Sequence, residues 1–122
     1  MKITYRGRQF NSLEELNEYF VNHGLTDFDE VNGLVWEEIR TATFKCYKYG
    51  PCHVHYIYLS LFRVTDYKSE LYVVARRDLN PCTDHDSIYG WDWEGDWEES
   101  IFNEAVSDFE KEGFELIEVH EY

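Results

Sequence analysis

An apolar run near the middle of the chain places the strongest limit on its fold. In residues 54–64, apolar side chains occupy both alternating sets of positions: Val54, Tyr56, Tyr58 and Phe62 on one, Ile57, Leu59 and Leu61 on the other. A strand that is apolar on both faces needs cover on both faces, so the run predicts the central strand of a sheet. A turn at residues 66–69 and a second strand at residues 70–77 then complete a predicted β-hairpin.

Two amphipathic helices are predicted, one before this hairpin and one after it. Ser12 and Glu15 form a capping box ahead of apolar residues with helical spacing, and Gly24 is a typical stop, which predicts a helix over residues 12–23. Asp96 repeats the capping pattern ahead of a second apolar stripe, which predicts another helix ending at Gly113. Residues 78–95, rich in Asp, Gly and Trp, are predicted to form a long loop.

Strands account for much of the remaining chain. The pattern indicates a short strand or hairpin over residues 2–10, a strand over residues 35–49 that is irregular near Glu37 and Glu38, and a final strand over residues 114–119. The order β-α-β-β-β-α-β predicts an α+β fold, with a mostly antiparallel sheet of about 4–5 strands and two helices. A length of 122 residues is typical of a single compact domain, here residues 1–122.

Charge is divided unevenly along the chain. Residues 1–77 contain ten acids and ten bases, whereas residues 78–122 contain fifteen acids and one base, Lys111, so the whole net charge of −14 lies in this acidic half. A chain with that charge is not expected to bind nucleic acid or anionic membranes by general electrostatic attraction. No apolar run approaches the roughly 20 residues that span a bilayer, and residues 1–10 lack the apolar core of a secretory signal, which predicts a cytoplasmic protein.

The acidic half arranges its carboxylates in a pattern that suits a basic protein surface. The predicted second helix displays acids where its apolar stripe leaves room: Glu98, Glu99, Glu104, Asp108, Glu110 and Glu112. Over roughly 22 Å of helix, these acids approach the phosphate density of one face of B-DNA. Just before them, tryptophans alternate with acids: Trp91, Asp92, Trp93 and Glu94. Tryptophan is frequent among interface hot spots and stacks with arginine, so both groups form the predicted partner-binding set.

Cysteine and histidine residues give a weaker indication of a metal site. The candidate ligands are Cys52, His53, His55, Cys82 and His85. Their spacing lacks the close Cys-x2-Cys pairs of structural zinc sites, so no metal and no cofactor is predicted. The chain also lacks a Gly-rich phosphate loop, a nucleophile elbow and a His-Glu-x-x-His pattern, and nearby acids would raise the pKa of a cysteine thiol. The chain is therefore predicted not to be an enzyme.

These observations favour a small acidic inhibitor of a basic nucleic-acid-handling protein, such as a nuclease or a CRISPR or restriction effector. It would occlude the DNA or RNA site of its partner by mimicry and would not bind nucleic acid itself. In size, charge and lack of catalytic motif, the chain resembles the small acidic proteins that phages use against host defence, such as anti-CRISPR and anti-restriction proteins. This resemblance is one of composition and implies no particular site residue.

Three alternatives remain from the sequence. An immunity protein that neutralises a nuclease toxin has the same physical character as the inhibitor. A metal-binding or small-ligand-binding α+β module would use the cysteine and histidine residues named above. An assembly protein would use the tyrosine-rich strands as a docking face.

Overall fold

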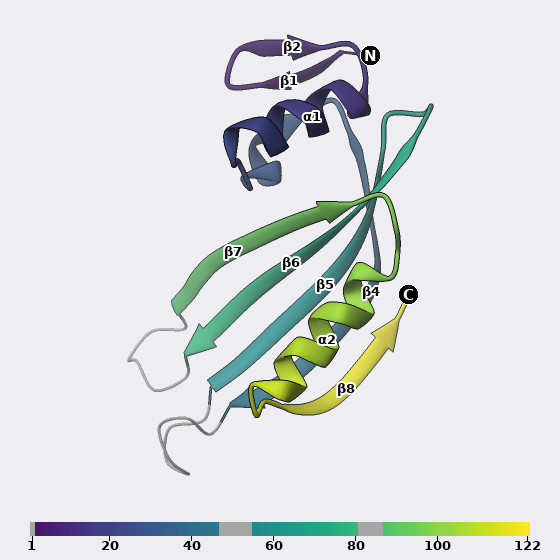
Figure 1. Cartoon of the computed structure of the whole chain (residues 1–122). Coiled ribbons are helices and arrows are strands. Elements are labelled where there is room, and N and C mark those ends of the chain that lie inside the picture. Colours follow the sequence, from purple (N-terminus) through teal and green to yellow (C-terminus); the bar gives the residue numbers. More distant parts are fainter. Residues whose placement is uncertain (1, 47–54, 81–86) are drawn as a thin grey trace.

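Eight strands and two α-helices form the described part of the chain, which covers residues 2–46, 55–80 and 87–122, without the side chains at 46, 55, 78–80 and 87–92, in a computed structural model. In chain order, the elements are β1 (Ile3–Tyr5), β2 (Arg8–Phe10), α1 (Leu13–His23), the 3-10 turn η1 (Phe28–Glu30), β3 (Val31–Asn32), β4 (Val35–Cys46), β5 (His55–Thr65), β6 (Glu70–Asn80), β7 (Ser87–Asp96), α2 (Ile101–Lys111) and β8 (Glu115–Glu121). The strands form two antiparallel sheets, so the predicted α+β class is confirmed (Figure 1). Neither described helix combines the length and the apolar character needed to cross a bilayer.

The larger sheet is built around the predicted central hairpin. Its strand order is β7-β6-β5-β4-β8, and each neighbouring pair is antiparallel. β5 is the middle strand, and both of its faces are covered: Leu61 is buried on one face and Val64 on the other. The predicted irregularity of β4 is also confirmed, as a β-bulge between Glu38 and Arg40.

The predicted loop at residues 78–95 is wrong for the part that the structure describes. Residues 78–80 extend β6, and residues 87–96 form β7, which pairs with β6 at the edge of the sheet. Asp and Gly are depleted in strands, so the composition of this segment favours a loop. The segment forms a strand because it pairs with β6. Residues 81–86 lie outside the described residues.

The N-terminal part, residues 2–32, carries a small sheet of order β2-β1-β3 and the helix α1. The predicted capping box is confirmed, because the Glu15 amide donates to Ser12 Oγ at 3.2 Å and the Glu15 carboxylate accepts from the Asn11 amide at 3.1 Å. Gly24 ends the helix in the left-handed region with φ of 62°. The predicted hairpin also forms, with β1 paired to β2.

Two hydrophobic clusters lie on opposite faces of the larger sheet. The first joins the N-terminal part to one face and includes Phe20 and Val73. The second joins α2 to the other face and includes Val74 and Phe102. Because side chains alternate along a strand, adjacent residues of β6 serve different clusters. The sheet therefore holds α2 and the N-terminal part separately, as Figure 1 shows.

Asp66, in the turn between β5 and β6, ties that hairpin to the start of α1. Its carboxylate accepts the amides of Lys68 and Ser69 at 2.9 Å within the turn, and the amide of Leu13 at 2.8 Å from the first turn of the helix. Burial alone would raise the pKa of Asp66, but these backbone hydrogen bonds outweigh it and hold the pKa below its usual value. A carboxylate at a helix N-terminus also interacts favourably with the helix dipole.

Replacing Asp66 by alanine should therefore lower the free energy of unfolding by about 2–3 kcal/mol, because three amides lose a charged acceptor. Urea unfolding followed by circular dichroism would measure the loss. The contribution of Asp66 is fully present above the unfolded-state pKa of about 4 and is lost as pH falls through the lower folded-state pKa. The D66A protein should thus lack that part of the acid destabilisation. An equal acid response in both proteins would contradict this role.

Candidate partner-binding surface

The alternating tryptophan and acid residues lie on β7, an edge strand of the larger sheet. Trp93 and Glu94 are adjacent in this strand, so their side chains lie on opposite faces of the sheet. Glu94 is exposed, whereas the side chains of Trp91 and Asp92 lie outside the described residues. The described part of the predicted group is therefore divided between the two faces of the sheet.

Trp93 packs into the molecule. Its ring centroid lies 5.4 Å from that of Trp36 and 5.7 Å from that of Phe62, which themselves contact each other. These rings come from β7, β4 and β5, and they border the cluster that holds the N-terminal part. In this structure the half-buried Trp93 anchors the edge strand, which is the structural role that aromatic residues commonly take.

The second helix begins later than its capping pattern predicts. α2 starts at Ile101, and residues 97–100 form a turn, so Glu98 and Glu99 precede the helix. Asp96 instead belongs to β7 and is paired with Tyr72 of β6, while its carboxylate accepts the Trp97 amide at 2.6 Å. The chain uses residues 97–100 to pass from the edge of the sheet to the start of α2 (Figure 1). The acidic helix is therefore roughly 16 Å long, shorter than the sequence predicted.

Acids on α2 occupy two flanks of the helix. Glu104 and Asp108, four residues apart, lie on one flank, and the C-cap residue Glu112 continues that row. Glu110 lies on the other flank, with Ser107 and Lys111 on the outer surface between them. All four acids are exposed. The helix therefore presents a row of three carboxylates on one side.

Arg40 of β4 links two acidic segments that are distant in the sequence. Its guanidinium contacts the Glu99 carboxylate at 3.1 Å and the Glu121 carboxylate at 2.9 Å. Glu99 belongs to the turn before α2, whereas Glu121 ends β8. Glu99 and Glu121 thus lie close together at the start of α2. Arg40 neutralises part of this charge and also lies 5.5 Å from the ring centroid of Phe102.

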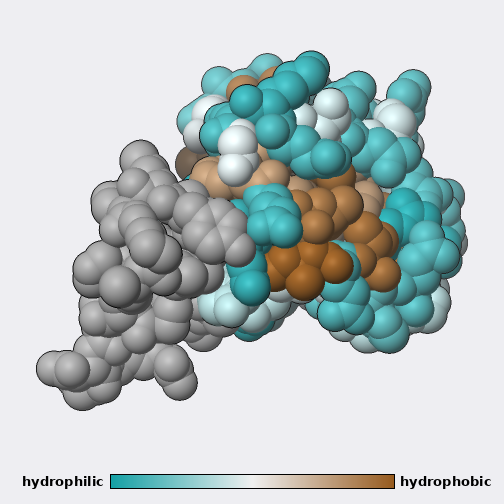
Figure 2. All heavy atoms as spheres, turned by 90° about the horizontal axis from the view of Figure 1, so that it is seen from below, coloured by the Kyte–Doolittle hydropathy of each residue, from teal (hydrophilic) through white to brown (hydrophobic). Residues whose placement is uncertain are grey.

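A groove of about 470 Å³ lies between α2 and β7. Leu59 and Val74 of the sheet and Ala105 and Phe109 of α2 give it apolar walls, and Glu94 contributes a carboxylate. A groove of this kind can take an apolar side chain or a small ligand. Figure 2 shows an apolar patch surrounded by hydrophilic residues on the face that is seen from below.

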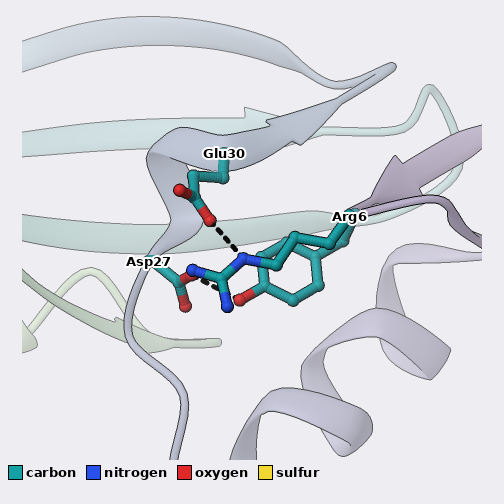
Figure 3. Close-up of polar contacts among 4 residues, drawn as sticks. Arg6, Asp27 and Glu30 are labelled. Atoms are coloured by element: carbon teal, nitrogen blue, oxygen red, sulfur yellow. Dashed lines mark hydrogen bonds and ion pairs between the residues drawn. The ribbon is translucent and has the colours of Figure 1, made fainter.

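A polar cluster in the N-terminal part has the clearest pKa shifts. Figure 3 shows Arg6 between Asp27 and Glu30, with Nη2 at 2.9 Å from Asp27 and Nε at 2.6 Å from Glu30. The Tyr5 hydroxyl donates to Asp27. Burial and this hydrogen bond raise the pKa of Tyr5 to about 12. Burial opposes a lowered pKa at Asp27, but the bond from Tyr5 and the charge of Arg6 outweigh it.

This cluster joins β1 to the segment around η1. Tyr5 is buried and belongs to the first hydrophobic cluster, so its hydroxyl needs the acceptor that Asp27 supplies. Every member therefore has a structural role in holding the N-terminal part together. Sequence patterns alone did not indicate it, because Tyr5 and Asp27 are 22 residues apart.

The candidate metal ligands, at which no metal was predicted, lie largely outside the described residues. This holds for Cys52, His53, Cys82 and His85, and for the side chain of His55, whose backbone begins β5. Within the described ranges, no group of three or more His, Cys, Asp or Glu residues is placed to hold a metal ion.

Comparisons of the whole chain with protein-family models, curated proteins and solved structures give no match.

Proposed function

We propose that the chain is a stoichiometric inhibitor that binds a basic nucleic-acid-handling protein and occludes its DNA or RNA site. One observation carries the proposal: every described carboxylate from residue 94 onward is exposed. These residues are Glu94, Asp96, Glu98, Glu99, Glu104, Asp108, Glu110, Glu112, Glu115, Glu118 and Glu121. The only base in the same part of the sequence is Lys111. A surface so rich in one sign of charge favours a partner of the opposite sign.

The number of exposed acids along α2 supports mimicry of a phosphate backbone. B-DNA presents roughly nine phosphates over 16 Å, about half of them on one face. The row of Glu104, Asp108 and Glu112, together with Glu99 and Glu121 beside Arg40, supplies a comparable number of carboxylates on a rigid frame. Lysine and arginine in a nucleic-acid cleft would form the charge-assisted hydrogen bonds that phosphates normally accept.

The target would be a nuclease or a CRISPR or restriction effector, met in the cytoplasm. A nuclease toxin with this chain as its immunity protein is a second form of the same interaction. Both forms need the same acidic surface, and the identity of the retained partner distinguishes them.

Affinity capture from bacterial lysate, with the purified chain as bait, tests the proposal. A basic nucleic-acid enzyme should be retained at low salt and released at high salt or by added DNA, because salt screens exposed charges. The retained enzyme, assayed at several DNA concentrations, should show an apparent KM for DNA that rises with the concentration of the chain. Retention of no nucleic-acid protein, or inhibition that DNA does not relieve, would contradict site occlusion.

A further inference from the structure

β8 is a free edge of the larger sheet. It follows β4 at the end of the strand order, and no other strand in the described part of the chain pairs with it. All seven of its residues, Glu115–Glu121, are exposed. Figure 1 shows β8 at the outer side of the sheet, next to the C-terminus. An edge strand of this length is a template on which another chain can add a strand.

The backbone of β8 presents hydrogen-bonding groups on its outer side. The Tyr122 amide donates to the Ile39 carbonyl at 3.2 Å, so it points toward β4. Because amides alternate in direction along an antiparallel strand, those of Val119 and Glu121 point away from β4. These amides can donate to an incoming strand without any change in the pairing of β8 with β4.

The side chains of β8 combine apolar and acidic character. Leu116, Ile117 and Val119 are 36%, 46% and 46% exposed. Three glutamates lie beside them: pairing with β4 puts Glu115 and Glu118 on one face of the sheet and Glu121 on the other. Natural edge strands are usually protected by charged side chains, proline, a β-bulge or cover from another element. The charged side chains of β8 are all acidic, so they repel an acidic strand and attract a basic one. Its surface offers apolar contact area and selects its occupant by charge.

A second copy of this chain, paired along the full length of β8, would bring like charges together. If two β8 strands paired antiparallel along their full length, Glu118 would face its own copy and Glu115 would face Glu121. Like charges directly opposite each other destabilise a pair of strands. A strand that carries lysine or arginine at the matching positions would instead form cross-strand ion pairs.

We propose that β8 is the docking edge for a strand of the partner, in which basic residues alternate with apolar ones. The added strand would extend the sheet to six strands, with backbone hydrogen bonds to Val119 and Glu121 and with its basic residues on the face that carries Glu115 and Glu118. The inference rests on the proposed function, because it takes the partner to be a basic protein. It goes further by naming the edge and the backbone form of the contact.

The test uses a synthetic ten-residue peptide of alternating lysine and valine, with a peptide of alternating glutamate and valine as the charge control. In amide NMR spectra of the full chain, the lysine peptide should slow hydrogen exchange at Val119 and Glu121, and the glutamate peptide should not. Val119→Pro removes an outward donor at an edge position that tolerates proline, and it should weaken binding at least 10-fold. Val119→Thr, which keeps the amide, should bind like the original chain.

Glu118→Lys gives an independent variant, because it leaves the backbone unaltered and should weaken the lysine peptide several-fold. Equal binding to V119P and the original chain, or protection confined to α2, would overturn the docking edge. So would sedimentation that shows a dimer of the original chain and a monomer of V119P. A captured basic enzyme that still binds V119P fully would overturn the edge and leave the proposed function standing, whereas capture of no such enzyme would remove the proposed function itself.

Discussion

Replacing Glu104, Asp108 and Glu112 together by lysine should weaken binding to the basic partner at least about 100-fold. These residues form one row along α2, so the change turns an attractive row of three negative charges into a repulsive row of three positive ones. Each close contact with lysine or arginine in the partner would then be repulsive and would reduce the binding free energy. Calorimetric titration of the captured enzyme with the variant would measure the affinity.

The matched control is Glu14→Lys, Glu18→Lys and Asp29→Lys, three exposed acids of the N-terminal part. It changes the net charge by the same amount, and its effect should stay within a few-fold at physiological salt, because charges farther than a Debye length of about 8 Å are screened. Equal weakening by both triple variants would assign the effect to net charge and leave no local interface. An unchanged affinity for the α2 variant would show that the helix is only a solvated face.

Association kinetics give a second measure of the same row. The original chain should associate faster as salt is lowered, since complementary charges steer diffusional encounter. The α2 variant should show a much smaller dependence on salt, or a reversed one. Stopped-flow mixing at several salt concentrations would record both slopes.

The sequence predicted α1 correctly because the residues that set its limits are close together in the chain. The limits of α1 follow from Ser12, Glu15 and Gly24, which lie within or beside the helix. The start of α2 was predicted wrongly because Asp96 has the features of a helix cap but pairs with Tyr72 of β6. A tertiary pairing outweighed a capping preference worth about 1 kcal/mol.

The candidate surface was predicted in composition but not in arrangement. Exposure of the acids in the C-terminal half agrees with the charge pattern, since unpaired carboxylates are rarely buried. The link between Glu99 and Glu121 depends on Arg40, which lies 59 and 81 residues away from them. Trp93 likewise packs on rings from two other strands. Contacts at such separations leave no periodic trace in the sequence.

Replacing Gly33 by alanine should lower the free energy of unfolding by at least about 3 kcal/mol, because two penalties act together. Gly33 has φ of 91°, a conformation that residues with a side chain rarely adopt. A Cβ atom at this position would also lie 2.3 Å from the backbone oxygen of Lys2. Because that oxygen belongs to the backbone, no side-chain movement can relieve the clash. The residue follows β3 and precedes β4, so any shift would disturb the pairing of β1 with β3.

Gly113→Ala is the matched control, because Gly113 has nearly the same φ, 95°, and no atom within 4 Å of an added Cβ. It should cost only the backbone penalty of about 1–2 kcal/mol. Urea unfolding of both variants separates the two terms, since their difference is the free energy of the close contact with Lys2. If both variants lose the same stability, β1 yields to the added methyl group, and the N-terminal part is held less tightly than its contacts indicate. A larger loss for G33A, with the amide signals of β1 most affected, would show that this close approach fixes the N-terminal part to the chain entering β4.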